Sequence, residues 1–326
     1  MADRIRVSDL DFVYISYAEP NKEENWADLL SKVPWAKRVD GVKGFDNAHK
    51  AAAEVAETDF FISVDGDNII DESFLLQTLD WEKTNKKAVH RWRAKNNING
   101  LVYGNGGIKM WPVEVVNRMR THEAAPATDK RAQVDFCWNI HYVQMNNWYS
   151  WVHNNGSPLQ AWRAGFREGV KMGLENGDVV DPAALKRIHR ENYRRLMVWM
   201  TVGEDTTNGL WAIYGARLGA YMTNVTRTDW DWKNVRDFDW LTKYFEEELA
   251  PQFAGGTELC PRTGYTWDKD KLKAKTVEIG TNLRNSLDLE LADIGVEGSR
   301  FWKTVYRNPS RLGAQVREDQ VQDTID

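Results

Sequence analysis

Two aspartates whose spacing could let them act together in chemistry, Asp65 and Asp67, lie in the segment VDGDN. They follow FFISV at 60–64, an uninterrupted apolar run that is typical of a strand covered on both faces. In extended backbone, alternate residues point the same way, so both carboxylates can face one cation. Hard divalent ions prefer oxygen ligands and often bridge to phosphate oxygens. The pair therefore predicts a site for Mn²⁺ or Mg²⁺ beside a phosphorylated substrate, although Asp-Gly is also a common turn and a DxD triplet arises by chance.

Other phosphate and metal motifs do not fit the sequence. An EF-hand loop starting at Asp65 would place Ile69 and Leu76 at ligand positions that neither side chain can fill. The chain contains no GxGxxG and no GxxxxGK[ST], which excludes the usual dinucleotide and P-loop sites. Its two cysteines, Cys137 and Cys260, are too few for a disulfide scaffold or a four-cysteine zinc site, and they favour a reducing compartment.

The elements that must position the two aspartates alternate between strand and helix patterns. LDFVYISY at 10–17 predicts a strand, and apolar residues at helical spacing predict a helix over 22–33. A short strand near 37–39 and an alanine-rich helix capped by Asp46 precede the strand at 60–64. This order predicts an α/β fold with a parallel sheet and right-handed crossovers. Ligands on such sheets bind beyond the carboxyl ends of the strands, where the aspartates lie.

The stretch from Leu10 to Phe74 resembles the nucleotide-binding half of GT-A glycosyltransferases, in the manner of their family-2-like members. The shared features are a first strand ending in ISYAEPN, a second strand ending near Asp40, the helix AHKAAAEVA, and FFISVDGDN with its DxD. The likeness is close over this stretch and looser up to about residue 150. It implies a GT-A-like mixed sheet flanked by helices, in which Asp65 and Asp67 hold Mn²⁺ or Mg²⁺ against the diphosphate of a nucleotide sugar, with a UDP-sugar as the simplest donor.

The same resemblance places further residues around the donor. Tyr17, Glu19 and Asp40 would line the nucleoside pocket, and Asp65 would also face the donor; ordinary loop polarity is the alternative for the first three. Lys50, in the first turns of the alanine-rich helix, would contact the diphosphate, since a helix N-terminus attracts phosphate. A solvated surface position explains Lys50 equally well.

The glycine-rich run NINGLVYGNGGIKMWP at 97–112 is similar to the segment that lines the acceptor site in GT-A enzymes. On that basis Gly106, Gly107 and Trp111 are expected to contact substrate, and a hairpin turn is the alternative. Arg163 and Arg167 are one helical turn apart and could grip phosphate or pair with neighbouring acids.

An inverting transferase needs a general base for the acceptor hydroxyl. The relatives place a carboxylate after the glycine pair, which makes Asp135 the first choice. The alternative is Glu204 or Asp205, which could instead cap the helix that follows. Many relatives add a histidine to the metal, and His153 is expected in that role, with His141 in reserve.

Composition bounds these expectations. The chain has 326 residues, of which 42% are hydrophobic and 28% charged, and a net charge of −5, so global charge does not hold it on nucleic acid. The first residues, MADRIRVSDLD, predict no signal peptide, and no apolar run is long enough to span a membrane, so a cytoplasmic protein is expected.

We expect three regions along the chain. They are a nucleotide-sugar and acceptor-loop region at 1–155, a mainly helical region at 156–307, and a polar tail at 308–326. Within the second region, Ser157–Pro158 is expected to open a helix, residues 208–222 another, and a single helix is expected between about Leu272 and Ile294.

A basic helix at 182–200, with Arg190, Arg194 and Arg195, points to a phosphate-bearing acceptor. Segments such as ISYAEPNKEENWADLL and WRAKNNINGLVYGNGGIKMWP also look like glycosyltransferases of tailed phages, some of which decorate hydroxymethylated pyrimidines such as hydroxymethylcytosine in DNA. DNA is therefore the expected partner, with the host cytoplasm as location. Polysaccharide, lipid-linked sugar and protein remain alternative acceptors. A nucleotidyltransferase or a non-catalytic nucleotide-sugar-binding protein is the alternative class, and the chain lacks the glycine- and lysine-rich loop that nucleotidyltransferases carry after the first strand.

Overall fold

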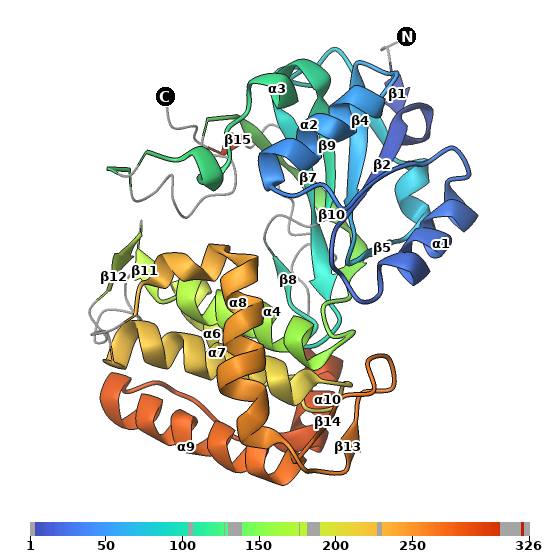
Figure 1. Ribbon diagram of the computed structural model, residues 1–326. Helices are drawn as coiled ribbons and strands as arrows, with labels where there is room; N and C mark the ends of the chain where they lie inside the picture. The colour runs from blue at the N-terminus through green and yellow to red at the C-terminus, as the bar shows by residue number, and fades with distance from the viewer. Residues whose placement is uncertain are drawn as a thin grey trace. The chain divides into compact units, whose positions relative to one another are not determined.

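The computed structural model describes residues 4–103, 107–126, 128–129, 139–175, 177–180, 190–226, 230–306 and 321–322. The chain divides into two compact units. Unit 1 comprises Met1–Asn97, Val102–His153 and Arg307–Asp326, and unit 2 comprises Ile98–Leu101 and Asn154–Tyr306. Figure 1 shows a sheet with covering helices in unit 1 and a bundle of helices in unit 2.

Unit 1 is built on a mixed sheet of nine strands among the described residues. In spatial order its main strands are β15 (Val321–Gln322), β10 (Tyr142–Val152), β7 (Val89–Asn96), β9 (Ile108–Pro112), β4 (Phe60–Asp65), β2 (Asp11–Ser16) and β3 (Lys37–Asp40). The short strands β5 (Asn68–Ile70) and β8 (Val102–Tyr103) pair with β10 and β7, and β1 (Arg4–Arg6) pairs with β6 (Thr78–Asp80). The helical segments of this unit are α1 (Lys22–Lys32), α2 (Phe45–Val55), α3 (Val113–Arg118), η1 (Val7–Asp9), η2 (Glu72–Leu76) and η3 (His122–Ala124).

The predicted strand–helix–strand–helix–strand unit is present. β2 lies between β3 and β4 and runs parallel to both. Ile15 is opposite Asp65, and Ser16 is opposite Asp40, so the carboxyl ends of the three strands meet at one edge of the sheet. β9 then pairs antiparallel with β4, which makes the sheet mixed. The predicted α/β class, with a mixed sheet flanked by helices, is confirmed.

Side chains alternate between two cores on the two faces of this sheet. Phe12 and Tyr14 of β2 belong to one core, which α1 completes with Leu29. Val13 belongs to the other core, to which α2 contributes Ala52. Because both faces are covered, the central strands must be apolar on both sides, as the FFISV run indicated.

Unit 2 is mainly helical, as predicted. Its helices are α4 (Pro158–Lys171), α6 (Arg190–Trp199), α7 (Gly209–Tyr221), α8 (Phe238–Tyr244), α9 (Lys269–Leu287) and α10 (Gly295–Val305). Shorter segments are β11 (Leu174–Glu175), β12 (Asp178–Val179), β13 (Glu258–Leu259), β14 (Thr266–Trp267), η5 (Met222–Thr226), η6 (Trp232–Arg236), η7 (Phe245–Leu249) and η8 (Ala250–Phe253). None of the helices described in either unit combines the length and apolar character needed to cross a bilayer.

The helix starts in unit 2 follow local capping chemistry. The hydroxyl of Ser157 accepts a hydrogen bond from the backbone N–H of Gln160, and Pro158 occupies the first turn of α4, as expected. The helix predicted between about Leu272 and Ile294 is present as α9, but its bounds differ and a second helix, α10, was not predicted. Asp268 caps α9 earlier, and Asp288 ends it in the left-handed region at φ 50°, after which α10 begins as a separate helix.

Interlocked glycines allow α4 and α7 to pack closely. Gly165 and Gly169 on α4 lie against the backbone of Ala212 and Ala216, and Gly215 on α7 lies against the backbone of Trp162. A methyl group at any of these glycines would overlap a carbonyl oxygen of the facing helix. Almost every residue of α7 is buried, so other elements of unit 2 must pack against all sides of this helix. The glycines let α4 do so at short distance.

Candidate functional site

The two aspartates lie at the sheet edge where β2, β3 and β4 end. Asp65 is the last residue of β4, and its backbone N–H donates to the carbonyl of Gly107 at 3.0 Å. Asp67 follows in the next turn, after Gly66. The carbonyl of Gly66 accepts hydrogen bonds from the Tyr14 hydroxyl at 2.7 Å and from Asn25 Nδ2 at 3.0 Å. The turn that carries both carboxylates is therefore held from α1 and β2.

A third carboxylate joins the two aspartates. A β-carbon built on Gly66 would lie 2.8 Å from Glu19 Oε2, so the Glu19 side chain rests on this glycine. Burial raises the pKa of Asp67 to about 7, and the negative charges of Asp65 and Glu19 add to the rise. A carboxyl group whose pKa is raised in this way, beside two other carboxylates, indicates a site that would bind a positively charged group.

The residues at this edge fit a divalent cation. Their donors are carboxylate oxygens, the ligands that Mg²⁺ and Mn²⁺ prefer. The buried amide oxygen of Asn68, next to Asp67, has no hydrogen-bond partner within the described part of the chain. No group of three or more His, Cys, Asp or Glu among the residues that the structure describes forms a ready-made metal site. A cation here would therefore need further ligands from phosphate or water.

A cation held by Asp67, as the sequence predicts, would compete with a proton for this carboxyl, which predicts a pH dependence. With a pKa of about 7, this carboxyl is mostly protonated at pH 6 and mostly ionised at pH 8. Since a cation binds the ionised form, Mn²⁺ affinity should rise about tenfold between these two pH values. Calorimetric titration of the protein with Mn²⁺ at both pH values measures this change in affinity. An affinity that does not vary with pH would contradict the raised pKa.

A lysine that the sequence analysis did not single out contacts this group. Lys109 on β9 is only 4% exposed, and its Nζ lies 3.3 Å from Asp65 Oδ2. The strand register explains the contact, because Lys109 pairs with Ser63 on β4, two positions before Asp65. The signal in the sequence was a single lysine in the otherwise apolar strand IKMWP at 108–112.

The helix α2 covers the same face of the sheet. His49 on α2 is buried, its Nδ1 lies 2.9 Å from the carbonyl of Phe45, and its ring packs edge-on against Trp111. Burial lowers the pKa of His49 to about 4, and the charge of Lys109 lowers it further, so the ring is neutral at physiological pH. Where an acceptor-lining side chain was expected at Trp111, the structure has a core residue whose Nε1 donates to Ser63 Oγ at 2.9 Å.

The residues expected around the nucleoside gather at the ends of β2 and β3. Tyr17 is exposed, and its backbone N–H donates to Glu19 Oε2 at 2.7 Å. Asp40 accepts hydrogen bonds from Lys22 Nζ and Ser16 Oγ, each at 2.7 Å. Burial by itself would raise the pKa of Asp40, but these hydrogen bonds hold it below its ordinary value. Asp40 is therefore ionised and fixed in place.

Gly107 has a clear structural reason to be glycine. A β-carbon there would overlap the side-chain amide of Asn68. Gly107 thus lets β9 approach the turn after β4, and its role in contacting substrate stays a prediction. Lys50 lies half-buried on α2. Gly106 and Asp135 lie outside the described residues.

His153 is joined to the aspartates through the backbone. Its N–H donates to the carbonyl of Asp67 at 2.6 Å, and its own carbonyl accepts from Asn21 Nδ2 at 2.8 Å. Burial lowers the pKa of the His153 imidazole, which keeps the ring neutral, as a metal ligand must be. Its side chain does not complete a three-ligand group with the described acids, so its role as a ligand stays a prediction.

The Glu-Asp pair considered as a base lies in unit 2 and is engaged in ion pairs. Asp205 pairs with Lys303 of α10 at 2.8 Å, and Glu204 pairs with Lys273 of α9 at 2.7 Å. Both carboxylates are nearly buried, at 11% and 8% exposure. These ion pairs connect the loop before α7 to α9 and α10. Glu204 and Asp205 therefore have a structural role.

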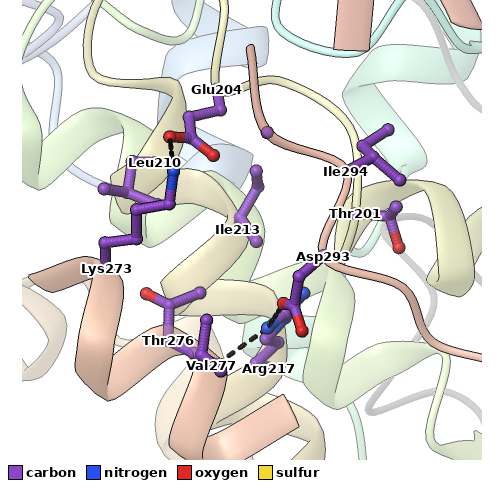
Figure 2. A pocket seen from close by; sticks show the side chains of 11 residues that line it. Thr201, Glu204, Leu210, Ile213, Arg217, Lys273, Thr276, Val277, Asp293 and Ile294 are labelled. Atoms are coloured by element: carbon purple, nitrogen blue, oxygen red, sulfur yellow. Dashed lines mark hydrogen bonds and ion pairs between the residues drawn. The ribbon is translucent and has the colours of Figure 1, made fainter. Parts of the chain in front are cut away.

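Glu204 also lines a pocket of about 160 Å³ within unit 2. Figure 2 shows the Glu204–Lys273 pair on one side of this pocket and Arg217 bonded to Asp293 on another. The guanidinium of Arg217 is almost fully buried and also donates to the carbonyls of Met200 and Thr276. The charges of this pocket are therefore paired within the protein.

The arginines selected from the sequence are found on two helices. The guanidiniums of Arg163 and Arg167 on α4 lie 4.4 and 4.8 Å from the ring centre of Phe238. On α6, Arg194 pairs with Glu191 at 2.9 Å, and Arg195 donates to Asn192 Oδ1 at 3.2 Å. The side chain of Arg190, at the start of α6, is outside the described residues.

Comparisons with known proteins add little to this picture. No family model and no curated protein matches the chain. Among solved structures, the chain is similar to a crystal structure of S. aureus TarS 1–349 in complex with UDP. The identity is 12%, the match covers 78% of this chain and 95% of that chain, and the TM-score is 0.30.

Proposed function

We propose that this chain is a glycosyltransferase that moves a sugar from a nucleoside-diphosphate sugar, most simply a UDP-sugar, to a hydroxyl acceptor. The observation that carries the proposal is the group of Glu19, Asp65 and Asp67 at the carboxyl ends of parallel strands. Burial and mutual repulsion raise the pKa of Asp67 to about 7 there. A parallel sheet binds its ligand at this edge, and the resemblance of the Leu10–Phe74 stretch to GT-A enzymes supports a nucleotide sugar as that ligand.

The chain's own residues prepare this edge for a diphosphate. Asp65 and Asp67 would hold a Mn²⁺ or Mg²⁺ ion, which supplies positive charge that stabilises the leaving diphosphate more in the transition state than in the ground state. Tyr14 and Asn25 fix the turn between the two aspartates in advance. Such preorganisation removes a reorganisation cost from the reaction.

The other donor contacts follow from the ends of the first two strands. Ser16 and Lys22 hold the Asp40 carboxylate at the expected nucleoside position, next to the exposed Tyr17. In an inverting reaction a carboxylate must also take the proton of the acceptor hydroxyl. Asp135 is our proposed base. Glu204 and Asp205 are less suitable because each is neutralised by a lysine.

A donor screen tests this function. The full chain is mixed with Mn²⁺ and a panel of nucleotide sugars, with and without hydroxymethylated DNA, and released nucleoside diphosphate is measured. Release with at least one donor, and its loss in excess EDTA, is the expected result. Release of pyrophosphate from nucleoside triphosphates would instead identify a nucleotidyltransferase. No turnover and no binding of any donor would overturn the proposal.

We further propose DNA that carries hydroxymethylated pyrimidines as the acceptor. The support is the basic helix α6, on an otherwise acidic chain, together with the resemblance to phage enzymes. Protein cations contact DNA phosphates without reading sequence and release counterions when they bind. Polysaccharide, lipid-linked sugar or protein acceptors in the same assay are the alternatives.

Replacing Arg190, Arg194 and Arg195 by alanine should weaken DNA binding and flatten its salt dependence. Each lost phosphate contact reduces the slope of log affinity against log salt by about 0.9, so a fall of about two to three is expected. Fluorescence anisotropy with modified duplex DNA at several salt concentrations measures the slope. The matched control replaces three lysines of α9, Lys269, Lys271 and Lys275, and should leave the slope unchanged. Equal slopes in both variants would remove α6 from the DNA site.

A further inference from the structure

A buried lysine contacts the carboxylate group at the donor site. Lys109 lies on the face of the sheet that α2 covers, together with Trp111 two positions along β9. It is 4% exposed, so its ammonium has lost most of its water. Burial of an unpaired ammonium is strongly unfavourable, which makes the ion pair with Asp65, at 3.3 Å, a requirement for this residue to be there at all.

The balance of charge around Lys109 is incomplete. Glu19, Asp65 and Asp67 bring three carboxylates to this edge. Burial and the charges of Asp65 and Glu19 raise the pKa of Asp67, and the Glu19 side chain lies against the glycine between the two aspartates. His49, on the covering helix, adds no positive charge to this balance, because its ring is neutral. With one lysine among three ionised carboxylates, the net charge of the group stays negative, so a divalent cation can still bind there. The lysine also supplies part of the positive charge that balances the carboxylates, and this part is permanent because it belongs to the protein.

We propose that Lys109 is a positioning residue of the donor site: its ammonium orients the Asp65 carboxylate and adds a fixed positive charge that favours binding of the donor's diphosphate even when no divalent ion is bound. This inference rests on the proposed function. By holding Oδ2 of Asp65, Lys109 leaves the other oxygen, Oδ1, for a cation. Because the ammonium is buried, its charge acts through a medium of low dielectric constant and is screened little by salt.

The test compares UDP binding by calorimetry in two buffers, one with EDTA and one with saturating Mn²⁺. In EDTA, Lys109→Met should weaken UDP binding by at least about tenfold, because the permanent charge is then the main attraction for the diphosphate. In Mn²⁺ the loss should be less than about threefold, since the ion contacts the diphosphate directly. A change in packing alone would weaken binding equally in both buffers.

Two further variants separate charge from folding. Lys109→Gln keeps a polar end at the same place and should lose UDP affinity in EDTA as Lys109→Met does. Lys32→Met removes another ion-paired lysine of unit 1, the partner of Asp28 on α1, and should bind UDP like the unaltered chain. Circular dichroism establishes that each variant is folded before binding is measured.

The outcomes are distinct. Unaltered UDP affinity in EDTA for Lys109→Met or Lys109→Gln overturns the inference and leaves the proposed function in place. Equal losses in both buffers also overturn it, and so does an unaltered chain that shows no binding in EDTA. If the unaltered chain binds no UDP or other nucleoside diphosphate even in Mn²⁺, the proposed function itself fails.

Discussion

Asp67→Asn should abolish sugar transfer and, at pH 8, make the protein more stable. The loss of activity should be at least about a thousandfold, because under the proposed function Asp67 would hold the cation whose charge stabilises the transition state. Asparagine keeps the shape of the side chain but cannot ionise. Initial rates of nucleoside diphosphate release with the best donor, at saturating Mn²⁺, measure the first effect.

The stabilising effect follows from the raised pKa of Asp67. In the unfolded chain this group ionises near its ordinary value of 3.8, but in the folded chain only near 7. The unfolded state therefore binds fewer protons between these values, and stability falls as pH rises from about 4 to about 7. Above pH 7 the full penalty is present, and Asp67→Asn removes it. Since Asp67 is partly exposed, we expect a gain of about 1 kcal/mol, or a melting temperature about 2–4 °C higher.

A control with the opposite sign is available. Asp40 has a lowered pKa and is held by Lys22 and Ser16, so its ionised form stabilises the folded chain. Asp40→Asn should therefore lower the melting temperature at pH 8, and the difference should shrink as the pH falls through the range in which Asp40 is protonated. Thermal melts at pH 8 and pH 5 test Asp67→Asn, and melts at pH 8 and about pH 3, below the ordinary carboxyl pKa of 3.8, test Asp40→Asn. Full transfer activity in Asp67→Asn would remove Asp67 from the proposed metal site, and a lower melting temperature of this variant at pH 8 would contradict the raised pKa of Asp67.

Gly215→Ala should strongly destabilise unit 2. The new methyl group would overlap the carbonyl oxygen of Trp162 and crowd the backbone N–H of Phe166 on the facing helix α4. Because these are backbone atoms, the overlap is relieved only if α4 and α7 separate. We expect a loss of at least about 3 kcal/mol in the free energy of unfolding, although alanine favours helix more than glycine does. Urea unfolding followed by tryptophan fluorescence measures it.

Gly298→Ala in α10 is the matched control for that substitution. There the added methyl group would crowd Cβ of Ile294, which belongs to the turn that opens α10 itself. A shift of that one turn can relieve the crowding without separating two packed helices, so the loss of stability should be clearly smaller than that of Gly215→Ala. Similar losses in both variants would show that close backbone packing between α4 and α7 is not what requires Gly215.

The local patterns of the sequence were sufficient for the framework of unit 1. Alternation of strand and helix periods predicted β2, α1, β3, α2 and β4, because periodicity and capping depend on neighbours in the chain. The position of Asp65 and Asp67 at the end of β4 followed from the same patterns. Unit 2 was harder: the αL residue Asp288, which separates α9 from α10, gives little local signal.

The residues of the site differ in how far local reasoning could reach. Trp111 looked like an acceptor contact in a glycine-rich segment, but β9 inserts it into the core, and a pattern of residue types does not show which strand a segment will join. Asp205 was the alternative base after Asp135, but the structure places its lysine partner, 98 positions further along the chain, beside it. Such ion pairs depend on tertiary contacts, which adjacent residues do not encode.

The sequence by itself determined that two carboxylates would stand at the tip of a buried parallel strand, because strand period and turn composition are local properties. Tertiary structure decided what surrounds them. The contact between Lys109 and Asp65 spans 44 positions and depends on β9 pairing antiparallel with β4 in one register. Glu19 reaches the same turn only because β2 and β4 are neighbours. The charge environment of the site is thus a product of strand pairing, since charges interact through space and not along the chain.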